Sequence, residues 1–439
     1  MSQLALAVSD PGMIRAAQKA CHDFPAGAAR NPHLGDVFLT TDAQIAAFSA
    51  LGHDSILGNL HLGGVAPGNI TSFAGLELLR YVSQDVLLVG GFFPATLAGI
   101  DNLARIDGSF QVTNTNGLSD LSALYPTLHT VGGSVSINGN VSLTSLDFCF
   151  GCLHSVGDSI DVFSNPALTS MNVSFLFLRT LGRFSLYSNP VLASAYVLCL
   201  RVTALTNVSN AAECFIVHSN PLLTTIESAF LSMSAFNNKI VVRDCALLTG
   251  FGISFVDAAT ATGANGGFEM KNLPVMVRPS GNVSNHPFDQ LVNVTGSGEI
   301  RYENLPSATD LGDNNHTFQQ LIDASAWDLY VVDCPLIPVA DVLPAAQKLR
   351  DLVIDNCDGL VFVVNFANLV QVRDFQFSGN ALIATIATFF AIDGGQITGN
   401  QFFIDDNPSL SSAGQVAPLI ANVVGEGYAG ATSNTGNAP

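Results

Sequence analysis

A segment of about 25 residues recurs along most of this chain and constrains its fold more than any other feature. Three consecutive copies read LHTVGGSVSINGNVSLTSL (128–146), LHSVGDSIDVFSNPALTSM (153–171) and LRTLGRFSLYSNPVLASA (178–195). In each copy two alternating apolar positions precede an asparagine, which predicts a short strand with one buried face. A single such strand cannot bury its own apolar face. We therefore expect neighbouring copies to stack into a parallel β-solenoid.

The asparagine that closes each predicted strand recurs once per turn and defines a ladder. At this position an asparagine would hydrogen-bond backbone groups of its own turn and of the next turn, which would otherwise be buried and unpaired. Cysteine would replace it as a small buried residue. Proline follows in several copies and ends the strand because it cannot donate to the sheet. We place the ladder at Asn140, Asn165, Asn189, Asn220, Cys245, Asn272, Asn304, Cys334, Cys357, Asn380 and Asn407.

The pattern V-x-I-x-x-N-x-x-L, carried by VGGSVSINGNVSLTSL and its copies, resembles the receptor L-domain family. Members of that family are leucine-rich-repeat-like, right-handed solenoids of receptor ectodomains, fungal cell-wall proteins and protist surface proteins. The resemblance covers about residues 36–420. The copies counted along the sequence predict about fourteen turns. The resemblance implies that they form a mainly β, right-handed parallel β-solenoid with a role in display, adhesion, ligand recognition or cell-wall structure without catalysis.

The segment 35–64 also resembles the start of that family's fold, where an amphipathic helix leads into the first turn. We therefore expect a short N-terminal helical cap within 1–53 and a continuous solenoid over 54–425. Two tandem L domains with a break near 257–267 are the alternative division. The small polar residues of 426–439 predict a flexible tail.

Composition and charge narrow the class of protein. Hydrophobic residues make up 48% of the chain and charged residues 12%, which excludes disorder for most of it. The net charge of −19 argues against binding to nucleic acid or to an anionic membrane surface. No run of about 18 apolar residues predicts a membrane insertion. The N-terminus lacks the features of a signal peptide, so the chain is expected to be either cytosolic or a mature form.

Seven Asn-X-Ser/Thr sequons suggest an extracellular or cell-surface glycoprotein. One of them, Asn140, also belongs to the ladder. We predict that Asn140 carries no sugar, because an inward side chain is out of reach of a transferase. The candidates for N-glycosylation are Asn69, Asn172, Asn207, Asn282, Asn293 and Asn315.

The cysteines allow several arrangements. The three on the ladder are predicted to be buried free thiols, with a disulfide between Cys334 and Cys357 on neighbouring turns as the alternative. Cys199 and Cys214 flank an unusually long turn, so a disulfide between them is predicted if the protein is secreted.

Two motifs could carry redox or metal chemistry. Cys149 and Cys152 form CFGC, but no second CxxC accompanies them, so a local bridge or two separate partners is expected instead. The acidic segments 310–316 and 403–408 are expected to be solvated turns, with calcium binding as the alternative. No cofactor and no metal site are predicted.

Glycoside hydrolysis requires two carboxylates held across a cleft. Asp333, Asp355 and Asp374 fall near predicted strand ends, one per turn, and could line up on one face. Aspartate is also an ordinary turn residue, and no nucleophile-elbow, phosphate-loop or dinucleotide-binding motif occurs. We therefore predict that the protein is not an enzyme.

The function expected from the sequence is a non-catalytic extracellular structural or adhesive glycoprotein, as a subunit of a surface layer, cell wall or filament. Its partners would be further copies of itself or other surface glycoproteins, because so few charges leave much neutral surface for assembly or a glycan coat. The alternative is a ligand-binding receptor ectodomain or carbohydrate-binding adhesin, and a third is a β-helix carbohydrate-active enzyme.

Overall fold

A computed structural model of the chain describes residues 31–438 apart from a set of short gaps, and the chain divides into two compact units, 1–202 and 203–439. The gaps are residues 65–68, 92, 125, 197, 200, 207–211, 227–229, 231, 251–258, 277–290, 310–320, 338–344, 361–367, 384–396, 400, 411–415, 418–419 and 422–430.

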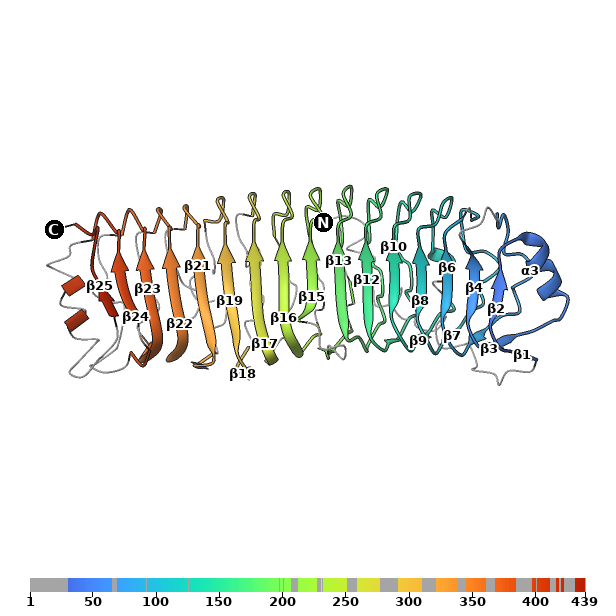
Figure 1. Cartoon of the computed structure of the whole chain (residues 1–439), viewed down its shortest axis with the longest axis horizontal. Helices are drawn as coiled ribbons and strands as arrows, with labels where there is room; N and C mark the ends of the chain where they lie inside the picture. Colours follow the sequence, from blue (N-terminus) through green and yellow to red (C-terminus); the bar gives the residue numbers. More distant parts are fainter. Residues whose placement is uncertain are drawn as a thin grey trace, which may run out of the picture. The chain divides into compact units, whose positions relative to one another are not determined.

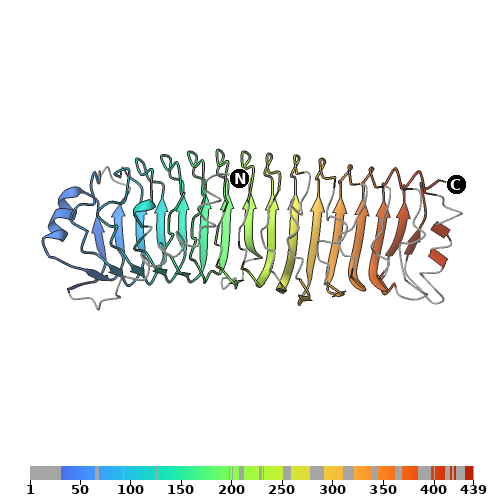
Figure 2. The same cartoon turned by 180° about the vertical axis from the view of Figure 1, so that it is seen from behind.

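Unit 1 contains two parallel sheets, to which successive turns contribute one strand each (Figure 1; Figure 2 shows the same strands from behind). The first sheet consists of β1 (Pro32–Leu34), β3 (Ser55–Leu57), β5 (Tyr81–Val82), β7 (Arg105–Ile106), β9 (Thr130–Val131) and β11 (Ser155–Val156). The second consists of β2 (Val37–Leu39), β4 (Leu60–Gly63), β6 (Val86–Val89), β8 (Phe110–Thr113), β10 (Val135–Asn138), β12 (Ser159–Phe163) and β13 (Arg183–Tyr187). A 3₁₀ turn spans Ser122–Leu124.

One short helix, α3 (Asp42–Ser49), lies beside β2 at the end of unit 1 (Figure 1). Thr41 is its N-cap and accepts a hydrogen bond from the backbone N–H of Gln44. Ile45 and Phe48 are its buried residues. The helix thus lies within the segment expected to form the N-terminal cap, but β1 and β2 of the first turn also lie there, so strands begin before residue 54.

Most strands of unit 2 are longer than those of unit 1. The described strands of unit 2 are β14 (Ala204–Leu205), β15 (Glu213–His218), β16 (Ala235–Arg243), β17 (Thr260–Lys271), β18 (Asn293–Val294), β19 (Gly298–Glu303), β20 (Asp323–Ala324), β21 (Trp327–Val332), β22 (Lys348–Asp355), β23 (Gln371–Ser378), β24 (Gln401–Asp405) and β25 (Ala431–Ser433). The short β14, β18 and β20 pair with the first residues of β16, β17 and β22, and the remaining strands pair in parallel in chain order. At Asn238, which has φ 72, the register of β16 shifts and the strand bends.

Alternating residues of each strand fill the interior. In β10, for example, Val135 and Ile137 have 0% exposed surface, while Ser136 and Asn138 face outward and are half-buried. The prediction of a mainly β, parallel solenoid is confirmed: 38% of the chain is strand, in a β-solenoid of about 12 turns where about fourteen were predicted.

The ladder lies in the interior and links successive turns. Asn140, Asn165 and Asn189 have 0% exposed surface. The Asn165 Oδ1 accepts from the backbone N–H of Asn140 at 3.1 Å and from its Nδ2 at 3.0 Å, and Asn189 repeats the first contact with Asn165. Each ladder residue follows a residue with positive φ, such as Ser164 (φ 54) or Ser188 (φ 56). The ladder therefore combines a left-handed turn residue with a buried side chain that satisfies the turn.

Two of the predicted ladder positions are wrong by one residue. Asn272 and Asn304 have φ 55 and 54, so they are the left-handed residues that precede the ladder, and Asn304 is exposed. The inward positions of these turns are Leu273 and Leu305, each with 0% exposed surface. Asparagine suits both positions, because its short side chain tolerates positive φ as well as a buried polar role.

The predicted boundaries also differ from the structure. β17 runs through most of 257–267 and pairs with β16 on both sides of the bend, whereas the two compact units divide at Val202 and Thr203. The expected flexible tail includes β25 and Asn437, whose Oδ1 accepts from the backbone N–H of Asn407 at 2.9 Å. Asn437 thus continues the ladder into the last turn. None of the described helices has the length and apolar character needed to cross a membrane.

Candidate functional site

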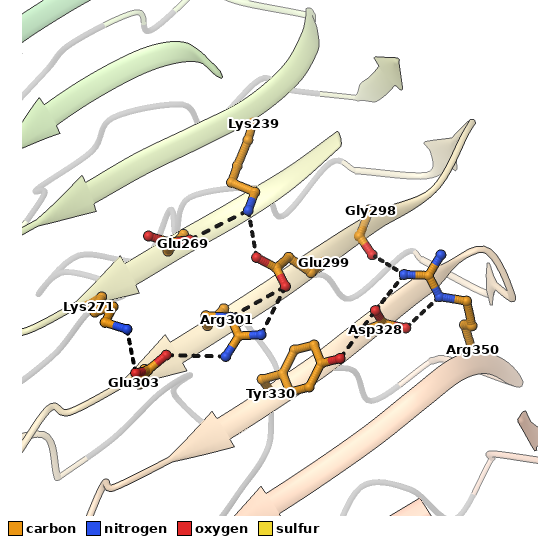
Figure 3. A network of polar contacts seen from close by, with 10 residues as sticks. All are labelled: Lys239, Glu269, Lys271, Gly298, Glu299, Arg301, Glu303, Asp328, Tyr330 and Arg350. Carbon is orange, nitrogen blue, oxygen red and sulfur yellow. Dashed lines mark hydrogen bonds and ion pairs between the residues drawn. The ribbon is translucent and has the colours of Figure 1, made fainter. Parts of the chain in front are cut away.

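The outer side of unit 2 carries a band of charged and polar side chains, here called the charged face (Figure 3). Their strand register places them in neighbouring rows: Gly267 lies between Lys239 and Glu299, and Arg301 lies beside Glu269. The side chains of its ion pairs are only 9% to 35% exposed, because they pack against one another. The charged face consists of Lys239, Glu269, Lys271, Glu299, Arg301, Glu303, Asp328, Tyr330 and Arg350.

Lys239 and Arg301 bind Glu299 from opposite sides. The Nζ of Lys239 lies 2.5 Å from Glu299 Oε1 and 3.5 Å from Glu269 Oε2. Lys239 reaches Glu299, two strands away, because Gly267 on the intervening strand has no side chain in the way. The Nη2 of Arg301 lies 3.1 Å from Glu299 Oε2. Glu299 is therefore fixed in one position by two cations.

The same pattern extends along β19. The Nη1 of Arg301 lies 3.2 Å from Glu303 Oε2, and the Nζ of Lys271 lies 2.5 Å from Glu303 Oε1. The guanidinium of Arg301 also lies over the Tyr330 ring, 4.0 Å from its centroid, which adds a cation–π contact. Ion pairs and stacking together hold this part of the outer surface in one arrangement.

Arg350 forms the other end of the charged face. Its Nε donates to Asp328 Oδ1 at 2.6 Å and its Nη2 to Asp328 Oδ2 at 2.5 Å, a two-pronged pair. The Nη2 also donates to the Gly298 carbonyl at 3.3 Å, and the Tyr330 hydroxyl donates to Asp328 Oδ2 at 3.4 Å. Asp328 is thereby bound on both oxygens.

The ion pairs favour the charged forms of Glu299 and Arg350. Burial acts to raise the pKa of Glu299, but hydrogen bonds from Lys239 and Arg301 outweigh it and hold that pKa below its ordinary value. The hydrogen bond to Asp328 raises the pKa of Arg350. Asp351, which follows Arg350 on β22, differs: burial, together with the charges of Asp328 and Asp374, raises its pKa in spite of its bond to Arg373.

A polar pocket of about 260 Å³ opens between Lys239 and Arg350. Two cations and two carboxylates line it, so its formal charge is balanced. The remaining lining residues are small, namely two glycines and a serine. The lining consists of Lys239, Gly266, Ser297, Gly298, Glu299, Asp328 and Arg350.

The indole of Trp327 lies against the glycines of this pocket. A Cβ on Gly298 would come within 2.8 Å of Trp327 Nε1, and a Cβ on Gly266 within 3.1 Å of the same ring, so only glycine leaves room for it. Trp327 has 0% exposed surface, and its Nε1–H has no hydrogen-bond partner. A buried unpaired donor costs about 1–3 kcal/mol, and none of the described residues provides an acceptor for this N–H.

A second aspartate–arginine pair lies on the next strand. The Nε of Arg373 donates to Asp351 Oδ1 at 2.8 Å and its Nη2 to Asp351 Oδ2 at 2.5 Å. Asp351 is paired in register with Asp374, as Glu299 is with Asp328. In the sequence, this row of aspartates could have been recognised from an aspartate followed by an inward-facing Leu or Phe of a strand, at 328–329, 351–352 and 374–375. Of the predicted group Asp333, Asp355 and Asp374, only Asp374 belongs to this row.

The structure does not bring those three aspartates together. Asp333 is the left-handed turn residue before a ladder position, with φ 54. Asp355 ends β22 and is paired in register with Ser378, whereas Asp374 is paired with Asp351. Asp374 accepts from the backbone N–H of Gln401, as expected of an aspartate that flanks a strand.

The sequons differ in exposure. Asn69 and Asn293 are exposed, and Asn172 is half-buried and accepts hydrogen bonds from the Ser194 hydroxyl at 2.7 Å and the Tyr196 N–H at 3.3 Å. Asn140 is buried. The other three candidates, Asn207, Asn282 and Asn315, lie outside the described residues.

The predicted disulfide between Cys199 and Cys214 is wrong, because both thiols are free and have 0% exposed surface. Cys334 and Cys357 are also free, and a hydrogen bond with Cys334 together with burial raises the pKa of the Cys357 thiol. The ladder cysteine Cys245 is likewise free and buried, with its pKa raised by burial to about 11.

The two cysteines of the CFGC motif differ in their oxidation state. Cys149 is free and buried, whereas Cys152 is disulfide-bonded, so a local bridge between them is wrong. Within the part of the chain that the structure describes, no three His, Cys, Asp or Glu side chains are grouped closely enough to hold a metal ion. Of the two acidic segments, 310–316 lies outside the described residues, and in 403–408 Asp405 accepts from the hydroxyl of Ser433 and the N–H of Thr435.

No protein-family model, curated protein or solved structure matches this chain.

Proposed function

We propose that this protein is a non-catalytic structural or adhesive protein of the cell surface, which uses the outer faces of its solenoid to bind other macromolecules or further copies of itself. The observation that carries the proposal is the division of residues between inside and outside. The interior of the described turns is filled with apolar and ladder side chains. The polar groups that could meet a partner lie in the charged face, on outward strand positions.

The state of the carboxylates supports a binding role over a catalytic one. A general acid in glycoside hydrolysis needs a pKa raised toward neutrality, near a second carboxylate that is free to react. Glu299 has a lowered pKa, and both oxygens of Asp328 are bound. Asp351 has a raised pKa but is held by two hydrogen bonds from Arg373.

An extracellular location is supported by the exposed sequons at Asn69 and Asn293 and by the disulfide bond of Cys152, since disulfides persist in oxidising compartments. The resemblance to receptor L domains points in the same direction. On this proposal the glycans would cover parts of the surface and leave the charged face as a contact area.

The test is secreted expression followed by light scattering and negative-stain imaging over a range of protein concentrations. We expect ordered oligomers or filaments, or retention on isolated cell walls or cell surfaces. A monomer that neither assembles nor is retained would contradict the proposal. Release of reducing sugar from a panel of polysaccharides would contradict its non-catalytic part.

A further inference from the structure

The pocket beside Arg350 has the size and lining of a site for a small ligand. We propose that it binds a single uncharged sugar ring at the end of a glycan. This inference deepens the proposed adhesive function by naming a class of ligand for it. Only the biological role of the bound sugar rests on that proposed function.

The volume of the pocket sets the size of the ligand. About 260 Å³ is smaller than the pockets that hold drug-sized ligands and is of the size that one pyranose ring requires. The pocket is an open hollow on the outer side of parallel strands, so a longer glycan could continue from the bound ring into solvent.

The lining sets the chemistry of the ligand. Lys239 and Arg350 offer N–H donors, and Glu299 and Asp328 offer carboxylate acceptors, on opposite sides of one hollow. Neighbouring hydroxyls of a sugar can donate and accept at the same time, so they complement such alternating groups. A charged ligand would face a like charge on one side, because the two cations and two carboxylates balance.

Trp327 supplies an independent observation. Its buried Nε1–H has no partner and lies next to Gly298, which lines the pocket. Trp327 does not itself line the pocket, so it adjoins the space for the ligand through Gly298. The glycines at 266 and 298 are what allow the indole to lie so close to the ligand space.

The experiment uses the whole glycosylated chain and its only tryptophan as the reporter. Trp327 fluorescence is followed during titration with methyl glucoside, methyl mannoside, methyl galactoside and N-acetylglucosamine, up to about 100 mM because one ring binds weakly. We expect a saturable change with at least one neutral sugar. The absence of a saturable change with all four sugars, or stronger binding of sodium glucuronate than of the neutral sugar, would overturn the proposal.

Two matched variants locate the site. Arg350→Gln removes the pocket's arginine, and Arg373→Gln removes the equivalent arginine of the next strand, which does not line the pocket. We expect Arg350→Gln to weaken sugar binding by about tenfold or more and Arg373→Gln to leave it unchanged. Equal effects of both variants would overturn the assignment. If Arg350→Gln fails to fold, as judged by circular dichroism, Lys239→Gln on the opposite side of the pocket replaces it.

The failure of this inference can be told from that of the proposed function. If the protein assembles or is retained on cell walls but binds no sugar, the assignment of the pocket is wrong and the structural role stands. If the protein binds sugar but neither assembles nor is retained, the assignment of the pocket stands and the structural role is wrong.

Discussion

Removing one ladder asparagine should cost far more stability than removing an outward asparagine of a nearby strand. The side chain of Asn165 makes five hydrogen bonds: Oδ1 accepts two from Asn140, and Nδ2 donates to Ile137 O at 3.0 Å, Phe163 O at 3.1 Å and Asn189 Oδ1 at 3.2 Å. Asn165→Ala would take away all five within the interior.

The magnitude follows from the groups left behind. The backbone N–H of Asn140 loses the Oδ1 acceptor at 3.1 Å, and the carbonyl of Ile137 loses the Nδ2 donor at 3.0 Å. The Ile137 carbonyl stays in the β10–β12 ladder, so the Asn140 N–H is the group left unsatisfied. At about 1–3 kcal/mol for a buried unsatisfied group, Asn165→Ala should lower the free energy of unfolding by about 1–3 kcal/mol. Phe163 O still accepts from the Gly139 N–H, so it adds little.

Asn165→Cys should fall between the wild type and the alanine variant. The ladder cysteines at 245 and 334 each direct their Sγ to the carbonyl two residues earlier, at 3.3 Å, which reproduces the contact of Asn165 with Phe163 O. Cys334 reaches the Tyr302 carbonyl of the previous turn only at 3.9 Å, so a cysteine would replace the contact between turns with a longer and weaker one. The matched control is Asn138→Ala, because Asn138 faces outward on β10 and bonds only surface hydroxyls of Thr113 and Ser136 among the contacts described. It should cost less than about 1 kcal/mol.

The assay is urea unfolding followed by circular dichroism, with midpoints compared between variants because a long repeat array need not unfold in one step. Hydrogen exchange of the amide of Asn140 gives a local measurement of the same effect. If Asn165→Ala shifts the midpoint no further than Asn138→Ala, the ladder is not what connects the turns.

Three further predictions follow from burial and charge. Glycopeptide mapping of the secreted protein should find no sugar on Asn140 and should find sugar on Asn69 or Asn293; a glycan on Asn140 would contradict its inward position. The six free cysteines should resist iodoacetamide at pH 8 in the native protein and react on unfolding, because each is buried; fast native labelling would refute this. The pKa of Glu299 in the folded state lies below its ordinary value, so the stabilising effect of its ion pairs is complete above that ordinary value and is lost as the pH falls through the folded-state pKa. Glu299→Gln should reduce the loss of stability on acidification in that range, and an unchanged acid titration would count against the ion pairs.

Much of the fold could be predicted from local pattern. The alternation around Val135 and Ile137 identified a strand and its inward face, and the spacing of the asparagines identified the turns. The errors came where one residue type suits two neighbouring positions. Asn272 and Asn304 fit the left-handed residue as well as the ladder, and only the backbone conformation distinguishes the two.

The charged face was harder to foresee, since its partners are far apart in the sequence. Lys239 and Glu299 are separated by 60 residues, and the bend at Asn238 sets the register that aligns them across Gly267. Insertions between the turns remove any constant spacing that would mark such pairs. The predicted disulfide between Cys199 and Cys214 was wrong for a related reason, because closeness in the sequence does not determine the direction in which two side chains point.

The sequence by itself determined that this chain would stack short strands into a parallel β-solenoid, because each repeat has one apolar face that only its neighbours can cover. It also determined which asparagines would be buried in most turns. The tertiary structure decided which outward residues meet, since that depends on the register between turns and on the glycines that let a side chain reach across a strand. The pocket beside Trp327 exists for that reason: residues 239, 266, 298, 328 and 350 are neighbours only after the turns have stacked.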